Sequence, residues 1–484
     1  MVIRLEVARM SSSSTLPNLI ADADLWAARL AGHADLADER LNTRLGLILS
    51  ALVAKPADSI PQASGAFSQA KAMYRFFANE RIAPDDLLQP VVDATIDAMR
   101  GLPTILAVQD TSSLNYSTLK TTTGLGPLND SETARGLHMH TTLAVRADGV
   151  AVGILDQSYW ARPLEERTGA RRKERPIEDK ESRKWLDGVE AAENTVASLP
   201  AEQRPRLIHV MDREGDVHAV LQRITDSPHF AIIRCAQNRS VAGAYDKAFA
   251  AVDATAVVGT VSIDVPRLSY QPAPAVPRRQ ATLELRAVSL TITPDRHKFP
   301  DRQPVTWTLI DAREINVPAG VEPLHWRLWT NLPADTRADI LEILRFYGFR
   351  WRIEDFHLTL KSGCQIEKLE LEEANRLIKA ATLYSAVAVR IVTLRDLARV
   401  EPTAPCTLIL TSDEWQALWV RFDKQKLAPD TKAPTIKQAV QWIGRLGGHL
   451  GRKRDGMPGV RTLWRGFRDL SLLAAGFHAG RLLR

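Results

Sequence analysis

The sequence predicts an α/β fold in which a β-rich insertion interrupts the core and helical regions flank it on both sides. Short apolar runs typical of strands alternate with helical stretches between about residues 101 and 400. Inside this region Leu283, Leu285, Leu290 and Ile292 alternate with polar residues at the period of a half-buried strand. Before residue 100, and again after Ser412, apolar side chains recur at helical spacing.

The length predicts several domains, because 484 residues at roughly 100–200 per domain make two to four. We expect residues 1–20 to form a loose N-terminal tail, whether translation starts at Met1 or at Met10. The expected domains are a helical domain over 21–100, an α/β domain over 101–400 with its insertion at about 240–335, and a helical C-terminal domain over 401–484.

The composition is that of a globular protein and excludes a mainly disordered chain, a collagen and a disulfide-rich miniprotein. The net charge of +6 is a mild indication of a polyanionic partner. Cys235, Cys364 and Cys406 are scattered and odd in number, so we expect neither a disulfide framework nor a structural zinc site. A cytoplasmic location fits this cysteine usage.

A membrane span is not expected, because we find no run of the roughly 18–20 apolar residues that a membrane helix needs. The most apolar stretch, Ala380–Val389, is closed by Lys379 and Arg390 and predicts a buried helix.

Basic residues recur in the helical N-terminal region, among them Arg44, Lys71 and Arg75. They indicate either a solvated helix face or a surface that contacts DNA, and the spacing alone leaves both open. A solvated loop explains the charge-dense segment from Arg162 to Lys184, with Arg171–Lys173 at its centre, about as well as a functional role does.

Two predicted strands of the core end in aspartate. Thr104–Asp110 is followed by hydroxyl residues, and the run Leu207–Asp212 leads into a loop that also holds Asp216. Alone, each aspartate is as well explained as a cap or turn residue.

A helix predicted from about Ala338 past Lys361 carries a further set of polar residues. On one continuous helix Tyr347, Arg350, Glu354 and Lys361 fall within an arc of about 60°, beside an apolar face. Such a stripe is also common among exposed ion pairs.

Together the three acidic residues suggest a metal site. Asp110, Asp212 and Glu354 could hold two divalent cations about 3.5–4 Å apart, the arrangement that serves phosphoryl transfer. Oxygen ligands favour Mg²⁺, with Mn²⁺ as a substitute. Arg350 and Lys361 would then hold a phosphodiester.

The ordered motifs resemble the insertion-sequence-4 family of bacterial DDE transposases, of the transposon-five type, from about Trp26 to the C-terminus. The family signature Tyr-x2-Arg-x3-Glu-x6-Lys is met by the four residues of the predicted helix. The other matching segments are 72–77 (AMYRFF), 108–116 (VQDTSSLNY), 211–218 (MDREGDVH) and 443–449 (IGRLGGH).

This resemblance implies a ribonuclease-H-like catalytic core with Asp110, Asp212 and Glu354 as its metal-binding catalytic triad. It places Trp326 where the family has an aromatic that stacks on a flipped base, although the nearby Trp329 leaves that choice open. It also implies a DNA contact for Arg234, whose alternative is a surface cation at a strand end. The chain departs from its closer relatives at Leu358, where they carry a lysine that touches DNA.

The implied activity is cut-and-paste transposition of double-stranded DNA. The enzyme would bind the end repeats of a mobile element, cleave through a hairpin intermediate and join the 3′-OH ends to target DNA. Two protomers would pair through the C-terminal helices, although their apolar stripe could equally pack within one chain. It consists of Trp464, Phe467, Leu470, Leu473 and Phe477.

Two other functions remain open. One is a metal-dependent nuclease that cuts without joining. The other is a non-catalytic DNA-binding relative or inhibitor, such as a form starting at Met73 would give.

Overall fold

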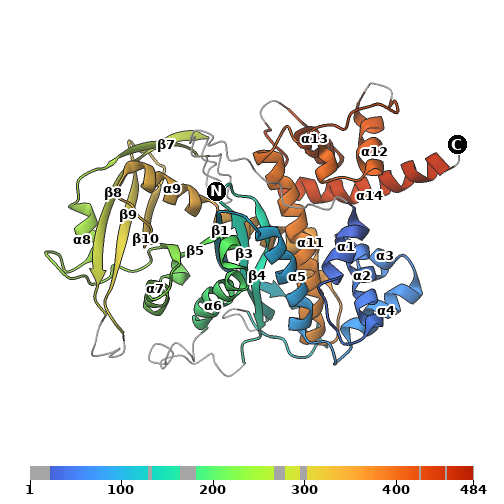
Figure 1. The fold of residues 1–484 in the computed structure, drawn as a ribbon, viewed down its shortest axis with the longest axis horizontal. Coiled ribbons are helices and arrows are strands. Elements are labelled where there is room, and N and C mark those ends of the chain that lie inside the picture. Colours follow the sequence, from blue (N-terminus) through green and yellow to red (C-terminus); the bar gives the residue numbers. More distant parts are fainter. Residues whose placement is uncertain are drawn as a thin grey trace. The chain divides into compact units, whose positions relative to one another are not determined.

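The computed structural model (Figure 1) describes residues 22–128, 133–163, 181–265, 278–294, 302–423, 427–452 and 455–482. The predicted tail over 1–20 and the basic run Arg171–Lys173 lie outside these residues. The described chain combines a mixed β-sheet with helical regions toward both termini, as the sequence predicts.

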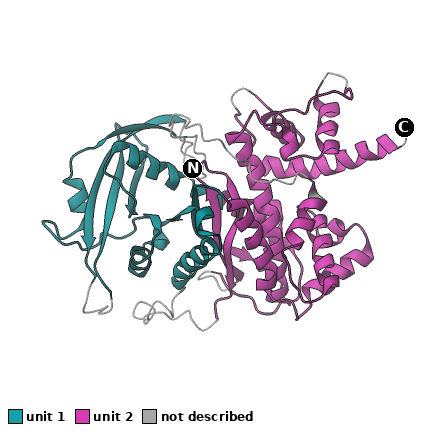
Figure 2. Cartoon of the chain, in the orientation of Figure 1, with its two compact units in different colours: residues 1–14, 101–110, 170–353 teal, residues 15–100, 111–169, 354–484 magenta. Residues whose placement is uncertain are grey.

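The chain divides into two compact units that interleave along the sequence (Figure 2). Unit 1 comprises residues 1–14, 101–110 and 170–353, and unit 2 comprises 15–100, 111–169 and 354–484. Strand β1 (Thr104–Asn115) therefore contributes its first seven residues to unit 1 and the rest to unit 2.

The sheet of unit 1 begins with three parallel strands and continues with antiparallel ones. β1 pairs with β5, and β5 with β6, in parallel, whereas β10, β9, β8 and β7 follow in antiparallel order. The predicted insertion thus extends the sheet. Besides β1, the sheet of unit 1 consists of β5 (Arg206–Met211), β6 (Phe230–Arg234), β7 (Gly259–Val265), β8 (Arg279–Ile292), β9 (Val305–Ile315) and β10 (His325–Thr330).

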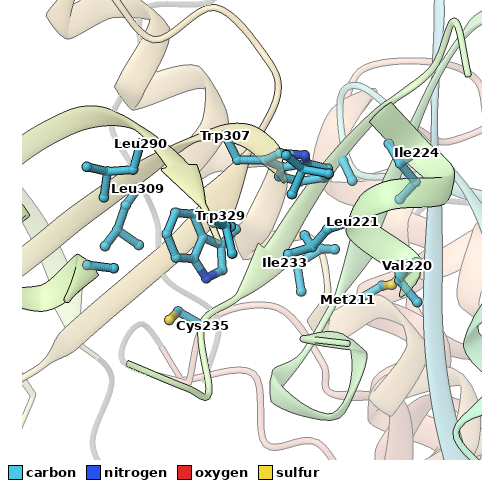
Figure 3. Packing of buried hydrophobic residues seen from close by; sticks show 14 of the residues in the cluster. Met211, Val220, Leu221, Ile224, Ile233, Cys235, Leu290, Trp307, Leu309 and Trp329 are labelled. Atoms are coloured by element: carbon cyan, nitrogen blue, oxygen red, sulfur yellow. The ribbon is translucent and has the colours of Figure 1, made fainter. Parts of the chain in front are cut away.

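Helices α6 (Arg183–Ala197), α7 (His218–Thr225) and α8 (Ala248–Asp253) bury their apolar residues against one face of this sheet. Figure 3 shows Leu221 and Ile224 of α7 in the same cluster as Trp307 and Trp329 of the strands. This cluster is the core of unit 1. It packs against the sheet whose strands β1 and β5 carry the acidic residues.

In unit 2, β3 (Arg135–Arg146) runs antiparallel both to β4 (Ala151–Trp160) and to the second part of β1. The direction relative to β1 follows from the contacts Thr111–His140 and Ser113–His138, in which one number rises as the other falls. The helices are α1 (Ala23–Ala31), α2 (Glu39–Ala54), α3 (Ile60–Ser64), α4 (Phe67–Phe77), α5 (Pro84–Met99), α11 (Ala374–Val400), α12 (Ser412–Phe422), α13 (Ile436–Leu446) and α14 (Val460–Leu482), with the short strand β2 (Gly126–Pro127).

Helix α11 corrects the expectation that no segment is long and apolar enough to cross a membrane. Among the described residues it is one helix that is long and apolar enough to cross a membrane, but 89% of its most apolar window is buried inside the protein. It contacts α5 and β4 within unit 2, and residues from Ala380 to Val389 are buried, as predicted. The helix is therefore apolar because it fills a core.

Helix α14 divides the predicted apolar stripe in two. Leu470 is fully buried in the C-terminal core, with Phe467 packed against it, so this half of the stripe packs within the chain. Further along, Leu473 and Phe477 are half-buried, and Leu472 is 67% exposed.

The predicted continuous helix from Ala338 past Lys361 is wrong. Helix α9 (Arg337–Gly348) ends at a tight turn, α10 (Trp351–Leu358) follows, and a π-helical turn covers Thr359–Gly363. At the turn, the N–H groups of Phe349 and Arg350 bond three residues back rather than four. Glycine at 348 weakens the helix there. The arc of about 60° therefore does not describe these residues.

Candidate active site

Two of the predicted acidic residues lie on neighbouring parallel strands of unit 1. The β1–β5 register runs from Thr104 opposite Arg206 to Val108 opposite Val210, so continuing it by two residues places Asp110 opposite Asp212. Paired strands lie about 4.8 Å apart, so this extended register brings the two residues to neighbouring positions, with Asp212 just beyond the end of β5. Asp212 directly follows β5, as predicted, and its side chain accepts a bond from the Glu214 N–H at 2.9 Å.

Asp110 differs from the expectation in one respect, because β1 continues five residues beyond it to Asn115. The strand extends because Thr111 and Ser113 find partners on β3, with their hydroxyls 2.9 and 3.3 Å from His140 and His138. Hydroxyl residues that would suit a turn are thus satisfied inside a strand.

The end of α9 and the turn after it bring an arginine and a tyrosine to the same two aspartates. Arg350 Nη1 lies 3.9 Å from Asp110 Oδ2, and the Arg350 side chain is 8% exposed. Burial raises the pKa of Tyr347, and the nearby charge of Asp212 raises it further, whereas Arg350 and Arg234 act against that rise. The phenol therefore stays protonated at neutral pH and can donate a hydrogen bond. Its hydroxyl is buried and makes no well-formed hydrogen bond in the described structure.

Trp326 and Trp329, which the sequence leaves unresolved, lie on opposite faces of β10. Trp329 is fully buried in the core of unit 1. The Trp326 ring instead meets Tyr347 edge-on, with centroids 6.3 Å apart. Arg234, at the end of β6, pairs with Leu328 between them in the strand register.

Glu354 and Lys361, the remaining residues of the predicted set, belong to unit 2. Glu354 lies partly exposed on α10. Lys361, in the π-helical turn, donates a hydrogen bond of 2.7 Å to the Ser113 carbonyl and lies 3.4 Å from the Glu367 carboxylate. Glu367 in turn accepts a bond from the Asn115 N–H at 2.8 Å. Lys361 thus fastens the turn to the end of β1, a structural contact that the sequence did not indicate.

The donor set fits a hard cation in its chemistry. Asp110 and Asp212 supply adjacent carboxylate oxygens, the ligands that Mg²⁺ prefers. Within the part of the chain that the structure describes, no three histidine, cysteine, aspartate or glutamate side chains come close enough to hold a metal ion. Asp110 and Asp212 are therefore two candidate ligands within unit 1, and the described residues do not form a three-ligand site.

The three basic residues proposed for the N-terminal region do not share one surface. Lys71 and Arg75 are exposed one turn apart on α4. Arg44 lies on α2 and donates a 2.7 Å bond to the side chain of Gln69. Gln69 is on the other side of α4 from Lys71, because two residues on a helix are separated by about 200°.

Asp216 was not singled out from the sequence, although it lies in the same loop as Asp212. Its fully buried carboxylate pairs with Arg239 and accepts bonds from the N–H groups of Ala236 and Gln237 at 2.8 and 3.1 Å. These contacts tie the loop after β5 to the segment after β6. His218, at the start of α7, is nearby, and burial with the charge of Arg239 lowers its pKa to about 4. Arg239 is 23 residues away, so no local pattern could reveal the pair.

Comparison with known families finds a matching family model for the N-terminal region and another for the C-terminal region. Residues 23–82 match the family model of transposase DNA-binding domains, and residues 386–483 match that of the Tn5 transposase dimerisation domain. These two matches support a Tn5-like transposase. The insertion-sequence-4 resemblance is consistent with this. Helices α1 to α4 of this Tn5-like transposase thus form most of a DNA-binding domain, and α12 to α14 lie in a dimerisation domain.

A solved structure of a piggyBac transposase synaptic complex with hairpin DNA is also similar, at 9% identity over 98% of this chain and 76% of that one. Its TM-score is 0.34, too low to bear on the details of this chain.

Proposed function

We propose that this Tn5-like transposase carries out cut-and-paste DNA transposition in the bacterial cytoplasm. It would bind the end repeats of a mobile element as a dimer, cleave them through a hairpin intermediate and join the 3′-OH ends to target DNA. The observation that carries the proposal is the parallel β1–β5 pairing, which supports neighbouring positions for Asp110 and Asp212, with Arg350 close to the first and Tyr347 to the second.

The strand pattern supports a ribonuclease-H-like core. β4, β3 and β1 follow one another in antiparallel order, and β5 and β6 continue parallel to β1. We assign this core to the predicted catalytic domain over 101–400, with β7 to β10 as its insertion. The predicted domains over 21–100 and 401–484 then take the DNA-binding and dimerisation roles.

Glu354 is proposed as the third carboxylate of the site with Asp110 and Asp212. When bound there, Mg²⁺ or Mn²⁺ supplies the charge that activates a water or 3′-OH and stabilises the leaving oxygen. Arg350 balances the charge of Asp110 and is placed to hold a phosphate. Trp326, only 7% exposed, would have to turn away from Tyr347 to stack on a flipped base.

Around this centre, Tyr347, Lys361 and Arg234 are proposed to contact the DNA backbone, as are Arg44, Lys71 and Arg75 of the N-terminal domain. Lys361 can do so only by leaving its bond to the Ser113 carbonyl or by sharing it. Phosphate contacts of this kind position the duplex without reading its sequence.

A cleavage assay tests the proposal. The full chain is incubated with a labelled duplex that joins one end repeat, taken from the DNA flanking the gene, to donor DNA. We expect a nick at the repeat boundary, then a hairpin, and then joining to a target plasmid, all requiring Mg²⁺ or Mn²⁺. Cuts without joined product would show a nuclease instead. Specific binding without any cut would show a non-catalytic relative.

Tyr347→Phe separates the structural role of this residue from its proposed contact. Because the hydroxyl makes no well-formed hydrogen bond in the free protein, the substitution should not lower the free energy of unfolding by more than about 0.5 kcal/mol. Losing a hydrogen bond to a charged phosphate should slow cleavage by about 10-fold or more. Urea unfolding and single-turnover cleavage measure the two effects, and an unchanged cleavage rate would remove Tyr347 from the DNA contacts.

A further inference from the structure

The DNA-binding domain exposes a phenyl ring that its fold does not use. Phe67, at the start of α4, is 85% exposed, more than any other large apolar side chain reported among the described residues. The opposite side of the same helix is well packed, with Met73, Phe76 and Phe77 buried. A single exposed apolar side chain is ordinary, so the surface around this ring decides whether it marks an interaction site.

Phe67 shares its face of α4 with polar and basic residues. At about 100° per residue, Phe67, Lys71, Tyr74 and Arg75 project within one arc of roughly 100°. All four are exposed, Tyr74 to 37%. Neither Lys71 nor Arg75 takes part in an ion pair among the described residues of the chain, so this face presents two unneutralised cations beside two aromatic rings.

This face borders a groove within unit 2, of about 890 Å³, between α3 and α4. Pro61 and Ala66 line it with Phe67 and Tyr74, and Lys71 and Arg75 lie along it. Arg376 also borders it and pairs with both Glu372 and Glu373, each 2.7 Å away, and Glu370 lies near Tyr74, so this edge of the groove is acidic. On the α4 side, the apolar surface is flanked by positive charge.

We propose that α4 enters the major groove of the end-repeat DNA, with the Phe67 ring against thymine methyl groups and with Lys71 and Arg75 on phosphates. This rests on the proposed function. The major groove admits an α-helix, and the C5 methyl of thymine is the apolar group that base edges present there. A phenyl ring has no hydrogen-bonding atoms, so it can discriminate bases there only through such a contact. Phe67 is then a specificity residue, whereas its two cationic neighbours set affinity.

Binding of the full chain to an end-repeat duplex and to a scrambled duplex tests this, measured by fluorescence anisotropy at several salt concentrations. Phe67→Ala should weaken end-repeat binding by about 10-fold and leave scrambled binding unchanged. Lys71→Ala should weaken both and reduce the salt slope by about one. Leu25→Ala, which truncates a 63% exposed leucine on α1, is the matched control and should change neither. Thermal unfolding should be the same for Phe67→Ala and the wild type, because the ring is solvated.

Replacing thymines of the repeat one at a time by deoxyuridine removes only the methyl group. At one or two positions this should weaken wild-type binding about threefold to tenfold and leave Phe67→Ala binding unaffected. No effect of deoxyuridine at any position would overturn the methyl contact. Equal binding by wild type and Phe67→Ala would overturn the inference while the proposed function stands. A wild type that does not prefer the end repeat would instead contradict the proposed function. Loss of self-association in Phe67→Ala, with specificity intact, would assign the groove to a second copy of the chain.

Discussion

Replacing Asp212 with asparagine is expected to lower the rate of DNA cleavage by about a thousandfold or more. The substitution removes a carboxylate that the β1–β5 register places beside Asp110. A metal centre stabilises charge in phosphoryl transfer by several kcal/mol, and each 1.36 kcal/mol is tenfold in rate, so losing a ligand should remove most of the reaction. Single-turnover cleavage of the end-repeat duplex in Mg²⁺ measures the effect.

Binding of the same duplex separates catalysis from folding in this experiment. The Asp212→Asn variant should bind the end repeat as the wild type does, since the DNA-binding match covers residues 23–82. Asp226→Asn is the matched control, because Asp226 is exposed at the end of α7. Glu354→Gln should reproduce the loss if Glu354 is the third ligand. Residual cleavage above about a tenth of the wild-type rate in Asp212→Asn would refute the proposed role of that carboxylate.

Asp216→Asn is expected to destabilise the protein by about 3–5 kcal/mol, the cost of leaving one partner of a buried ion pair uncompensated. The Asp216 side chain is fully buried and Arg239 is 10% exposed, so water cannot replace the lost charge. Ala236 and Gln237 both donate to one carboxylate oxygen, Oδ2, so the asparagine amide can keep these bonds only by turning its NH₂ group toward the Arg239 guanidinium.

Urea unfolding followed by tryptophan fluorescence measures this loss. Asp187→Asn is the control in the same unit, since the Arg183–Asp187 pair is about half exposed on both sides and should contribute less than 1 kcal/mol. A loss below about 1 kcal/mol in Asp216→Asn would mean that Arg239 finds another partner or reaches solvent.

The ends of β5 and β1 show which strand ends can be predicted from local sequence. The apolar run before Asp212 predicts a strand that ends there, and β5 does end at Met211. The same argument places the end of β1 at Asp110, and this is wrong because His138 and His140 on β3 satisfy the hydroxyls that follow. Whether a polar residue ends a strand depends on its partner strand, which the local sequence does not contain.

The predicted helix from Ala338 past Lys361 also shows that local sequence did not determine the structure. No residue between Tyr347 and Lys361 forbids a helix except for the modest cost of Gly348, so spacing alone favours one continuous element. The structure instead inserts a tight turn and a π-helical turn, and these decide where Arg350 and Lys361 point. Trp326 and Trp329 likewise differ only in which face of β10 packs against the core.

The sequence by itself determined the helical ends, the β-rich insertion, the family resemblance and the identity of the candidate residues. These follow from periodicity and from ordered motifs, both of which are properties of the chain in one dimension. Only the tertiary structure decided that β1 pairs in parallel with β5 with Val108 opposite Val210, that Asp216 serves the fold, that Lys361 is bound to β1 and that Phe67 is left exposed. Each of these depends on which distant segments pack together, because burial and pairing arise from contacts across the fold and not from the order of neighbouring residues.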